Sequence, residues 1–152
     1  MNSQFEASDA RYEEKVIESF NRQEVMKTIS ASILAIRPGE IELEFPYQSN
    51  LAQQHGFIHA GIVSTVLDSA CGYAAFSLMP ENAAVLTIEF KVNLLSPAKG
   101  ERLRAVGKVK KLGKNITVTE GELFSYAEGG QKLVATMVGT IMSVYDREGI
   151  EN

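Results

Sequence analysis

One acidic residue stands in an apolar segment, where a charge is costly. Asp68 is the only formally charged side chain between Glu44 and Glu81, and residues 61–78 around it are otherwise apolar or small. An unpaired charge in an apolar interior is usually neutralised, paired or turned toward a cavity in which it acts. Asp68 is therefore a candidate general base or nucleophile, and the alternative is a structural role as a cap or as half of a buried ion pair.

The start of the same segment holds a second group that could do chemistry. A helix that begins near Ala60 would present free N–H groups and the positive end of its dipole, which favour a developing oxyanion. On that helix Ala60, Ser64, Asp68 and Gly72 follow one another at four-residue spacing and share one stripe. A polarised carbonyl and a nearby carboxylate are what acyl-group hydrolysis requires.

Other reactive side chains favour different chemistry. His55 and His59 are four residues apart and could bind a metal together with Asp68, but no second carboxylate lies near, so we expect no metal site. Ser64 lacks the G-x-S-x-G pattern of a hydrolase serine. The single cysteine, Cys71, excludes an intrachain disulfide and is interpreted as buried packing.

The elements that position these groups form an α+β domain. The 152 residues, 45% of them hydrophobic, fit one domain over 1–152. We expect an N-terminal amphipathic helix over about 8–23, capped by Ser8 or Asp9, and a core over about 28–145. A long buried helix is predicted from about Ala60 to Met79. The predicted strands are 28–36, 40–46, 85–95, 103–110, 116–126 and 132–145. Short links between them indicate an antiparallel sheet wrapped around one helix.

The strand after the helix carries a hydroxyl at its start. Strict alternation puts one set of residues on a common face, namely Leu86, Ile88, Phe90, Val92 and Leu94. Thr87 then belongs to the opposite face with Glu89, Lys91 and Asn93. Its hydroxyl could hold a water molecule, although threonine is also simply a good strand former.

Charge and leader signals restrict the partners. The chain carries −4 overall, yet residues 99–114 hold seven basic residues and one acid, a local +6. Such a patch on an acidic protein argues against a general nucleic-acid binder and suits either a nucleotide phosphate or a solvated hairpin. No secretory signal is recognised and residues 60–79 are too polar for a membrane span, so we expect a cytoplasmic protein without a membrane partner.

The linked spacings resemble those of the hotdog-fold acyl-CoA thioesterases of the phenylacetate-degradation type. The resemblance covers about residues 28–145 and rests on three motifs: His59-Ala60-Gly61 followed by Asp68, the strand from Thr87 through Pro97 to Gly100, and Gly113-Lys114. It implies the hotdog fold, an antiparallel sheet around a long central helix. It also implies hydrolysis of an acyl- or aryl-CoA to free acid and coenzyme A, without a metal or redox cofactor.

The resemblance also implies roles for individual residues. The backbone N–H of Ala60, in the turn His59-Ala60-Gly61, polarises the thioester carbonyl. Asp68 activates water or attacks directly, and Thr87 supplies the hydroxyl. Gln53 occupies the place of an asparagine that binds the carbonyl or water, and Ala60 replaces a glycine of the family pattern. The site forms between two subunits of a homodimer or dimer of dimers, so that Asp68 of one chain faces Gln53, His59 and Ala60 of the other.

Coenzyme A phosphates are expected near basic residues of the +6 segment. Lys114 beside Gly113 is the first candidate, and Lys99 is another. Two rival functions remain open at this point, a hotdog hydratase or dehydratase and a non-catalytic acyl-CoA binding protein. The sequence does not specify the acyl group.

Overall fold

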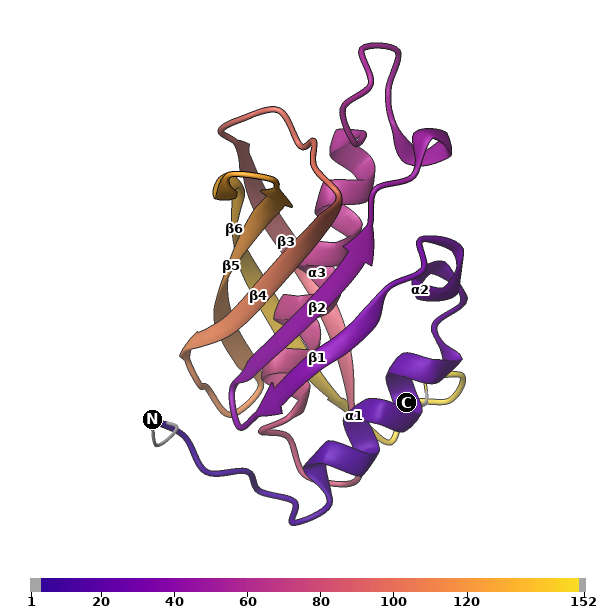
Figure 1. The fold of residues 1–152 in the computed structure, drawn as a ribbon. Helices are drawn as coiled ribbons and strands as arrows, with labels where there is room; N and C mark the ends of the chain where they lie inside the picture. The colour runs from indigo at the N-terminus through magenta and orange to yellow at the C-terminus, as the bar shows by residue number, and fades with distance from the viewer. Residues whose placement is uncertain (1–3, 151–152) are drawn as a thin grey trace.

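Alternating apolar residues and short turns fold most of the chain into one antiparallel sheet. The computed structural model describes residues 4–150. Its six strands lie in the order β1-β2-β4-β5-β6-β3 (Figure 1). Their bounds are β1 Ser32–Arg37, β2 Glu40–Pro46, β3 Ala83–Leu94, β4 Arg102–Lys111, β5 Ile116–Ala127 and β6 Gly130–Tyr145. All neighbouring strands pair antiparallel, which leaves β1 and β3 at the two edges of the sheet.

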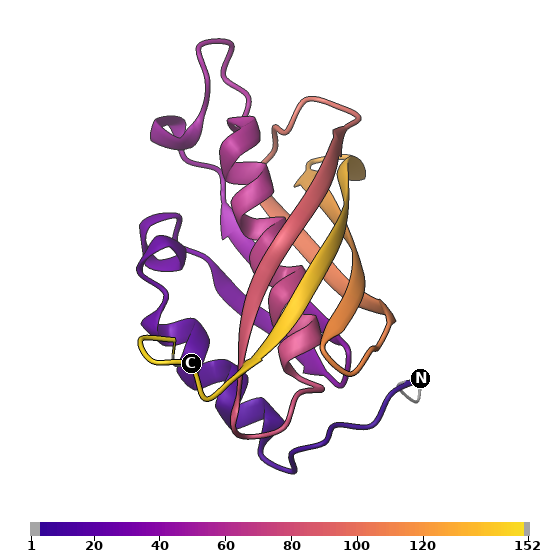
Figure 2. The same cartoon turned by 180° about the vertical axis from the view of Figure 1, so that it is seen from behind.

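The long helix α3, Ala60–Phe76, lies in the concave face of this sheet (Figures 1 and 2). Glycines on adjacent strands allow the close approach. A Cβ atom added at Gly107 would lie 2.3 Å from the carbonyl of Ala70, and one at Gly121 would lie 2.9 Å from Cys71 Sγ. Because Gly107 and Gly121 pair across β4 and β5, they form one smooth patch under the helix. The helix is therefore buried from Ser69 to its end.

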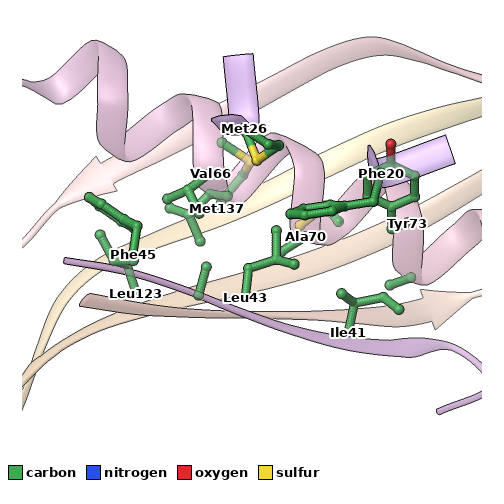
Figure 3. Close-up of a cluster of buried hydrophobic side chains, with 14 of the residues drawn as sticks. Phe20, Met26, Ile41, Leu43, Phe45, Val66, Ala70, Tyr73, Leu123 and Met137 are labelled. Atoms are coloured by element: carbon green, nitrogen blue, oxygen red, sulfur yellow. The ribbon is translucent and has the colours of Figure 1, made fainter. Parts of the chain in front are cut away.

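The core fills the space between the helix and the sheet. Figure 3 shows side chains of α3, of the inner faces of β2, β5 and β6, and of the N-terminal helices meeting there. The labelled residues are Val66, Ala70, Tyr73, Ile41, Leu43, Phe45, Leu123, Met137, Phe20 and Met26. Inward and outward residues alternate along β2, β4 and β5, as the period of a half-buried strand requires.

Two short helices precede the sheet, α1 at Tyr12–Arg22 and α2 at Glu24–Thr28, with Gln23 between them. Both views place α1 at the end of the sheet where α3 finishes (Figures 1 and 2). The Lys15 ammonium donates to the Met79 carbonyl over 2.5 Å and ties α1 to the segment after α3. The N-terminal helices thus form a third wall beside α3 and the sheet.

The predicted order of elements and the hotdog fold class are confirmed, with local corrections. Arg11 occupies the N-cap position of α1 without a side-chain cap hydrogen bond, whereas Asp9, three residues before the helix, accepts from the Arg11 N–H through its Oδ1. The helix α2 was not predicted, and because it extends to Thr28, β1 begins at Ser32 instead of at residue 28. The long helix ends at Phe76, three residues before the predicted end. None of the helices within residues 4–150 has the length and apolar character needed to cross a bilayer.

Candidate active site

Asp68 and Thr87 meet on the inner side of the sheet. The Thr87 hydroxyl donates to Asp68 Oδ1 over 2.7 Å. Thr87 pairs with the fully buried Ile141, so it faces the helix, and the prediction that it shares a face with Glu89 is wrong. The reason is a β-bulge between Thr87 and Glu89, where one extra residue shifts the alternation of β3.

The carboxylate of Asp68 lines a cavity of about 450 Å³, which we call the acid cavity. Its walls come from α1, the α1–α2 junction, α3 and the start of β3. They consist of Ser19, Arg22, Gln23, Asp68, Ser69, Gly72, Tyr73, Val85, Leu86 and Thr87. Burial raises the pKa of Asp68 above the usual value, and the hydrogen bond from Thr87 lowers it by a smaller amount. A half-buried carboxyl with a raised pKa in a cavity is suited to accept a proton.

The start of α3 leaves one backbone donor available. His59 is the N-cap, and its Nδ1 accepts from the Gly61 N–H over 2.8 Å. The Ile62 N–H bonds the His59 carbonyl over 2.9 Å. Within residues 4–150 no acceptor is assigned to the N–H of Ala60, the first residue of the helix. This donor sits at the positive end of the helix dipole, where a carbonyl oxygen would be polarised.

A second cavity, of about 490 Å³, opens beside this helix start, and we call it the loop cavity. Its lining is mainly apolar and comes from the loop before α3 and from the region after β3. The residues are Gln53, Gln54, Phe57, Ile58, His59, Ala60, Val63, Leu94, Leu95, Ser96, Pro97, Ala98 and Val134. Gln53, His59 and Ala60 thereby line one cavity. Gln53 also shapes the loop, because its side-chain oxygen accepts from the His55 N–H and its backbone N–H bonds the Phe57 carbonyl.

The two cavities of one chain are separate. Ala60 and Asp68 are eight residues apart on one helix, which corresponds to about 12 Å along its axis. A carbonyl bound at the Ala60 N–H is therefore out of reach of the Asp68 carboxylate of the same chain. The structure brings Asp68 to Thr87, and it brings Gln53 and His59 to Ala60, but it does not unite these two groups.

Most basic residues of the 99–114 segment are occupied on the outer face of the sheet. Four of them form ion pairs between 3.1 and 3.7 Å. The pairs are Arg102–Glu44, Arg104–Glu42, Arg104–Glu44, Lys108–Glu40 and Lys110–Glu120. Lys99 follows Ala98 of the loop cavity. Gly113 and Lys114 lie beyond the other end of β4, and Gly113 serves a tight turn, because an added Cβ would come within 2.1 Å of the Ile116 carbonyl oxygen.

The remaining reactive side chains have structural surroundings. His59 holds the helix start through Gly61, as a turn-fixing histidine does. Burial raises the pKa of the Cys71 thiol to about 12, so this cysteine of α3 is unreactive packing between the helix and the sheet. Within the described part of the chain, no group of three His, Cys, Asp or Glu residues is placed to hold a metal ion.

Sequence reasoning missed the contribution of the N-terminal helices to the acid cavity. Ser69 Oγ donates to Gln23 Oε1 over 2.9 Å, and the hydroxyls of Ser19 and Tyr73 lie 3.2 Å apart. The sequence signal was weak, since α1 reads as an ordinary amphipathic helix. The polar residues of α1 and of the α1–α2 junction are explained only by their contacts with Tyr73 and Ser69 of α3, which are distant in the sequence.

Comparisons with known proteins agree on one family. The family model described as "Thioesterase superfamily" matches residues 55–130. A Halobacterium salinarum protein whose name assigns it provisionally to the esterases is 32% identical over 122 residues, covering 76% of this chain and 78% of that protein.

Solved structures carry the same fold. A thioesterase family protein from Silicibacter pomeroyi is 54% identical with a TM-score of 0.87, covering 88% of this chain and 98% of that one. The PaaI protein from the phenylacetic acid degradation operon of E. coli has a TM-score of 0.80 at 19% identity, covering 88% of this chain and 94% of that one, and it supports the fold alone.

Proposed function

The chain belongs to the thioesterase superfamily, and from that premise we propose that it hydrolyses the thioester of an acyl-CoA to a free acid and coenzyme A. The observation that carries this proposal is the Asp68 carboxyl, which lines a cavity and accepts a hydrogen bond of 2.7 Å from the Thr87 hydroxyl. Burial raises the pKa of this carboxyl. A carboxylate so placed can take a proton from water or attack a carbonyl. A cytoplasmic location fits this substrate.

The proposed reaction needs two groups at the thioester. The carbonyl oxygen accepts a hydrogen bond from the Ala60 N–H, which stabilises the negative charge that develops there. Asp68 removes a proton from water while the water oxygen bonds to the carbonyl carbon. The carbon–sulfur bond then breaks, and the proton passes to the departing thiolate. These steps require no metal or redox cofactor.

A nucleophilic route uses the same groups. Asp68 would attack the carbonyl carbon and expel the thiolate, and water would then hydrolyse the resulting mixed anhydride. Single-turnover hydrolysis in oxygen-18 water distinguishes the routes. In the general-base route the label enters the product acid at once, whereas direct attack followed by water addition at the aspartyl carbon leaves the first label in Asp68.

A second copy of the chain completes the proposed site. Ala60 and Asp68 are placed symmetrically about Ser64, so a two-fold axis passing Ser64 brings Ala60 of one copy opposite Asp68 of the other. The half-buried positions on this side of α3, which include Ser64 and Asp68, are mostly small and allow a close approach. The acid cavity of one copy would then adjoin the loop cavity of its partner.

The edge strand β3 supports the same axis. Apolar side chains of β3 are unusually exposed, with Ile88 at 52%, Phe90 at 45% and Leu94 at 56%. A long apolar edge strand is a template for pairing with another strand. Thr87 lines the acid cavity and Leu94 lines the loop cavity. Antiparallel pairing of two β3 strands, centred between Phe90 and Lys91, would therefore place Thr87 of one copy opposite Leu94 of the other.

The helix and the strand give neighbouring centres for this axis. Ser64 lies about one turn, or about 6 Å, before Asp68. Because a strand advances about 3.3 Å per residue, the same distance along β3 from Thr87 is about two residues and leads to Glu89, about one to two residues from the centre between Phe90 and Lys91. The homodimer is thus part of the proposal, and a dimer of dimers remains the larger assembly that the family resemblance implies.

The loop cavity suits the pantetheine arm of coenzyme A. Its lining is largely apolar, and Lys99 follows directly after Ala98 in its wall. Within residues 4–150, Lys99 takes part in none of the assigned ion pairs, so its charge is available to a phosphate. Gly113 and Lys114 lie at the opposite end of β4, and a role for them would require the partner copy.

The proposed function is tested by thiol release from a panel of acyl-CoAs. We expect wild-type turnover of at least one acyl-CoA and a loss of about 10²- to 10⁴-fold in kcat/KM for Asp68→Asn. A carboxylic ester of matched acyl group serves as the control for thioester preference. Acyl-CoA binding without thiol release would favour the binding-protein alternative, and hydration of an enoyl-CoA without thiol release would favour the hydratase.

A further inference from the structure

The acid cavity continues past Asp68 to a polar wall that the hydrolytic steps do not use. Ser19, Arg22 and Gln23 come from α1 and the α1–α2 junction, and Tyr73 comes from α3. The three N-terminal residues precede the segment 55–130 that matches the thioesterase family model. The N-terminal part of this wall therefore lies outside the matched family segment.

Hydrogen-bond donors outnumber acceptors along this wall. Gln23 Oε1 accepts the hydrogen bond from the Ser69 hydroxyl, and within residues 4–150 the Gln23 amide nitrogen has no assigned acceptor. Ser19 and Tyr73 share one hydrogen bond, which uses one hydroxyl hydrogen and leaves the other. The Arg22 guanidinium has no ion pair assigned within the same described range.

The charged group of this wall, Arg22, lines the same cavity as Tyr73. Burial raises the pKa of the Tyr73 hydroxyl, while the hydrogen bond with Ser19 and the positive charge of Arg22 act in the opposite direction. The Arg22 charge and the paired hydroxyls thus belong to the same wall of the acid cavity. Together these groups form a donor-rich end of the cavity with a positive charge at its rim.

The distance from Asp68 to this end suits the tail of an acyl group. Tyr73 lies five residues beyond Asp68, which corresponds to about 7.5 Å along the helix axis. Gly72 lies between them, and a Cβ atom added there would meet nothing within 4 Å. The cavity is thus open along the helix from the carboxylate to the hydroxyl pair, and its volume of about 450 Å³ fits a short acyl chain.

An alkyl tail would displace water from these donors and return no acceptor, which costs binding energy. Given the proposed thioesterase function, on which this inference rests, we propose that the N-terminal helices select short acyl groups that end in an oxygen acceptor. That acceptor is a terminal carboxylate or a terminal hydroxyl. The oxygen bonds the Ser19–Tyr73 pair and the Gln23 amide, and a carboxylate is favoured further by Arg22.

Three acyl-CoAs of equal chain length test this inference, namely hexanoyl-CoA, 6-hydroxyhexanoyl-CoA and adipoyl-CoA. We expect kcat/KM for at least one oxygenated substrate to exceed that for hexanoyl-CoA by about tenfold or more. The double variant Ser19→Ala/Tyr73→Phe removes both hydroxyls and keeps the Tyr73 ring, which packs against Phe20 and Phe76. It should lose most of that preference and keep hexanoyl-CoA hydrolysis.

Arg22→Met separates the two kinds of tail. It should lower kcat/KM for adipoyl-CoA alone if the acceptor is a carboxylate, and leave all three values unchanged if it is a hydroxyl. Hydrolysis of hexanoyl-CoA as fast as both oxygenated substrates would overturn the inference while leaving the proposed function intact. A preference that survives in the double variant would overturn the role of α1. Thiol release from none of the three, but from another acyl-CoA of the wider panel, would overturn this inference alone. Thiol release from no acyl-CoA at all would overturn the proposed function and this inference with it.

Discussion

At the scale of single residues, the acidity of Asp68 is set by burial and by Thr87 in opposite directions. Burial disfavours the charged form and raises the pKa, whereas the Thr87 hydroxyl donates to the charged form and lowers it. The base must be charged to accept a proton, so the rate falls as the pH drops through this pKa.

Thr87→Val should therefore shift the acid limb of the pH–rate profile to higher pH, because it removes the hydrogen bond that lowers the Asp68 pKa. Thr87→Ser, which keeps the hydroxyl, should retain the wild-type limb. The measurement is kcat/KM against pH from about 4 to 8 for the three proteins. A Thr87→Val limb at or below the wild-type position would contradict the assignment.

Removing the charge of Asp68 should also stabilise the folded protein. The folded pKa is raised above the unfolded one, so the folded state binds more protons and loses stability as the pH rises through the two values. Asp68→Asn is expected to melt at a higher temperature than wild type at pH 7. The difference between the two melting temperatures should narrow toward pH 4, where Asp68 becomes increasingly protonated in both the folded and the unfolded wild-type protein. A difference that does not change with pH would argue against a pKa origin.

The backbone donor at Ala60 can be removed without a misfit. His59 has φ −59° and ψ 140°, a conformation that a following proline tolerates, and proline is common at the first residue of a helix. We expect Ala60→Pro to fold and to lose about 10²- to 10³-fold in kcat, because the N–H is gone. Ala60→Gly keeps the N–H and should keep the activity. Equal activity of the two variants would remove Ala60 from the mechanism.

Residue types could identify these candidates from the sequence, but not their contacts. Asp68 stood out because a lone charge in an apolar run is physically unusual. The contact with Thr87 depends on a bulge in β3, which alternation cannot reveal because the extra residue shifts the phase. The polar role of Tyr73 was equally hidden, since it depends on how α1 packs.

At the scale of elements, two buried glycines give opposite expectations. A Cβ at Gly107 would meet the backbone of Ala70 and Cys71, whereas one at Gly72 would meet nothing within 4 Å. Gly107→Ala should destabilise the protein by about 1–3 kcal/mol, because α3 must move away from β4. Gly72→Ala should stabilise it by about 0.5–1 kcal/mol through helix propensity. Urea unfolding measures both, and destabilisation of similar size at the two positions would contradict this packing.

The same contrast explains which elements could be predicted. Apolar alternation and turn residues located all six strands and the long helix. The short helix α2 was missed because five residues carry too little periodicity, and its Met26 is held by tertiary packing. The close packing of α3 against Gly107 and Gly121 was not predicted, because these glycines are far apart along the chain.

At the scale of the whole molecule, one chain holds two half-sites that are about 12 Å apart along α3. The acid cavity has the carboxylate, and the loop cavity has the free N–H. The sequence could indicate this division only through the family resemblance, since periodicity places Ala60 and Asp68 on one stripe without showing which partner each one faces.

In the proposed homodimer, Asp68 of one copy acts on a carbonyl held by Ala60 of the other. Asp68→Asn and Ala60→Pro, each inactive alone, are refolded together as an equal mixture, and thiol release is measured. Random pairing yields heterodimers in which one site carries both changes and the other carries neither, so activity should recover to about a quarter of wild type. Activity that stays at the average of the two separate variants would contradict a site shared between copies.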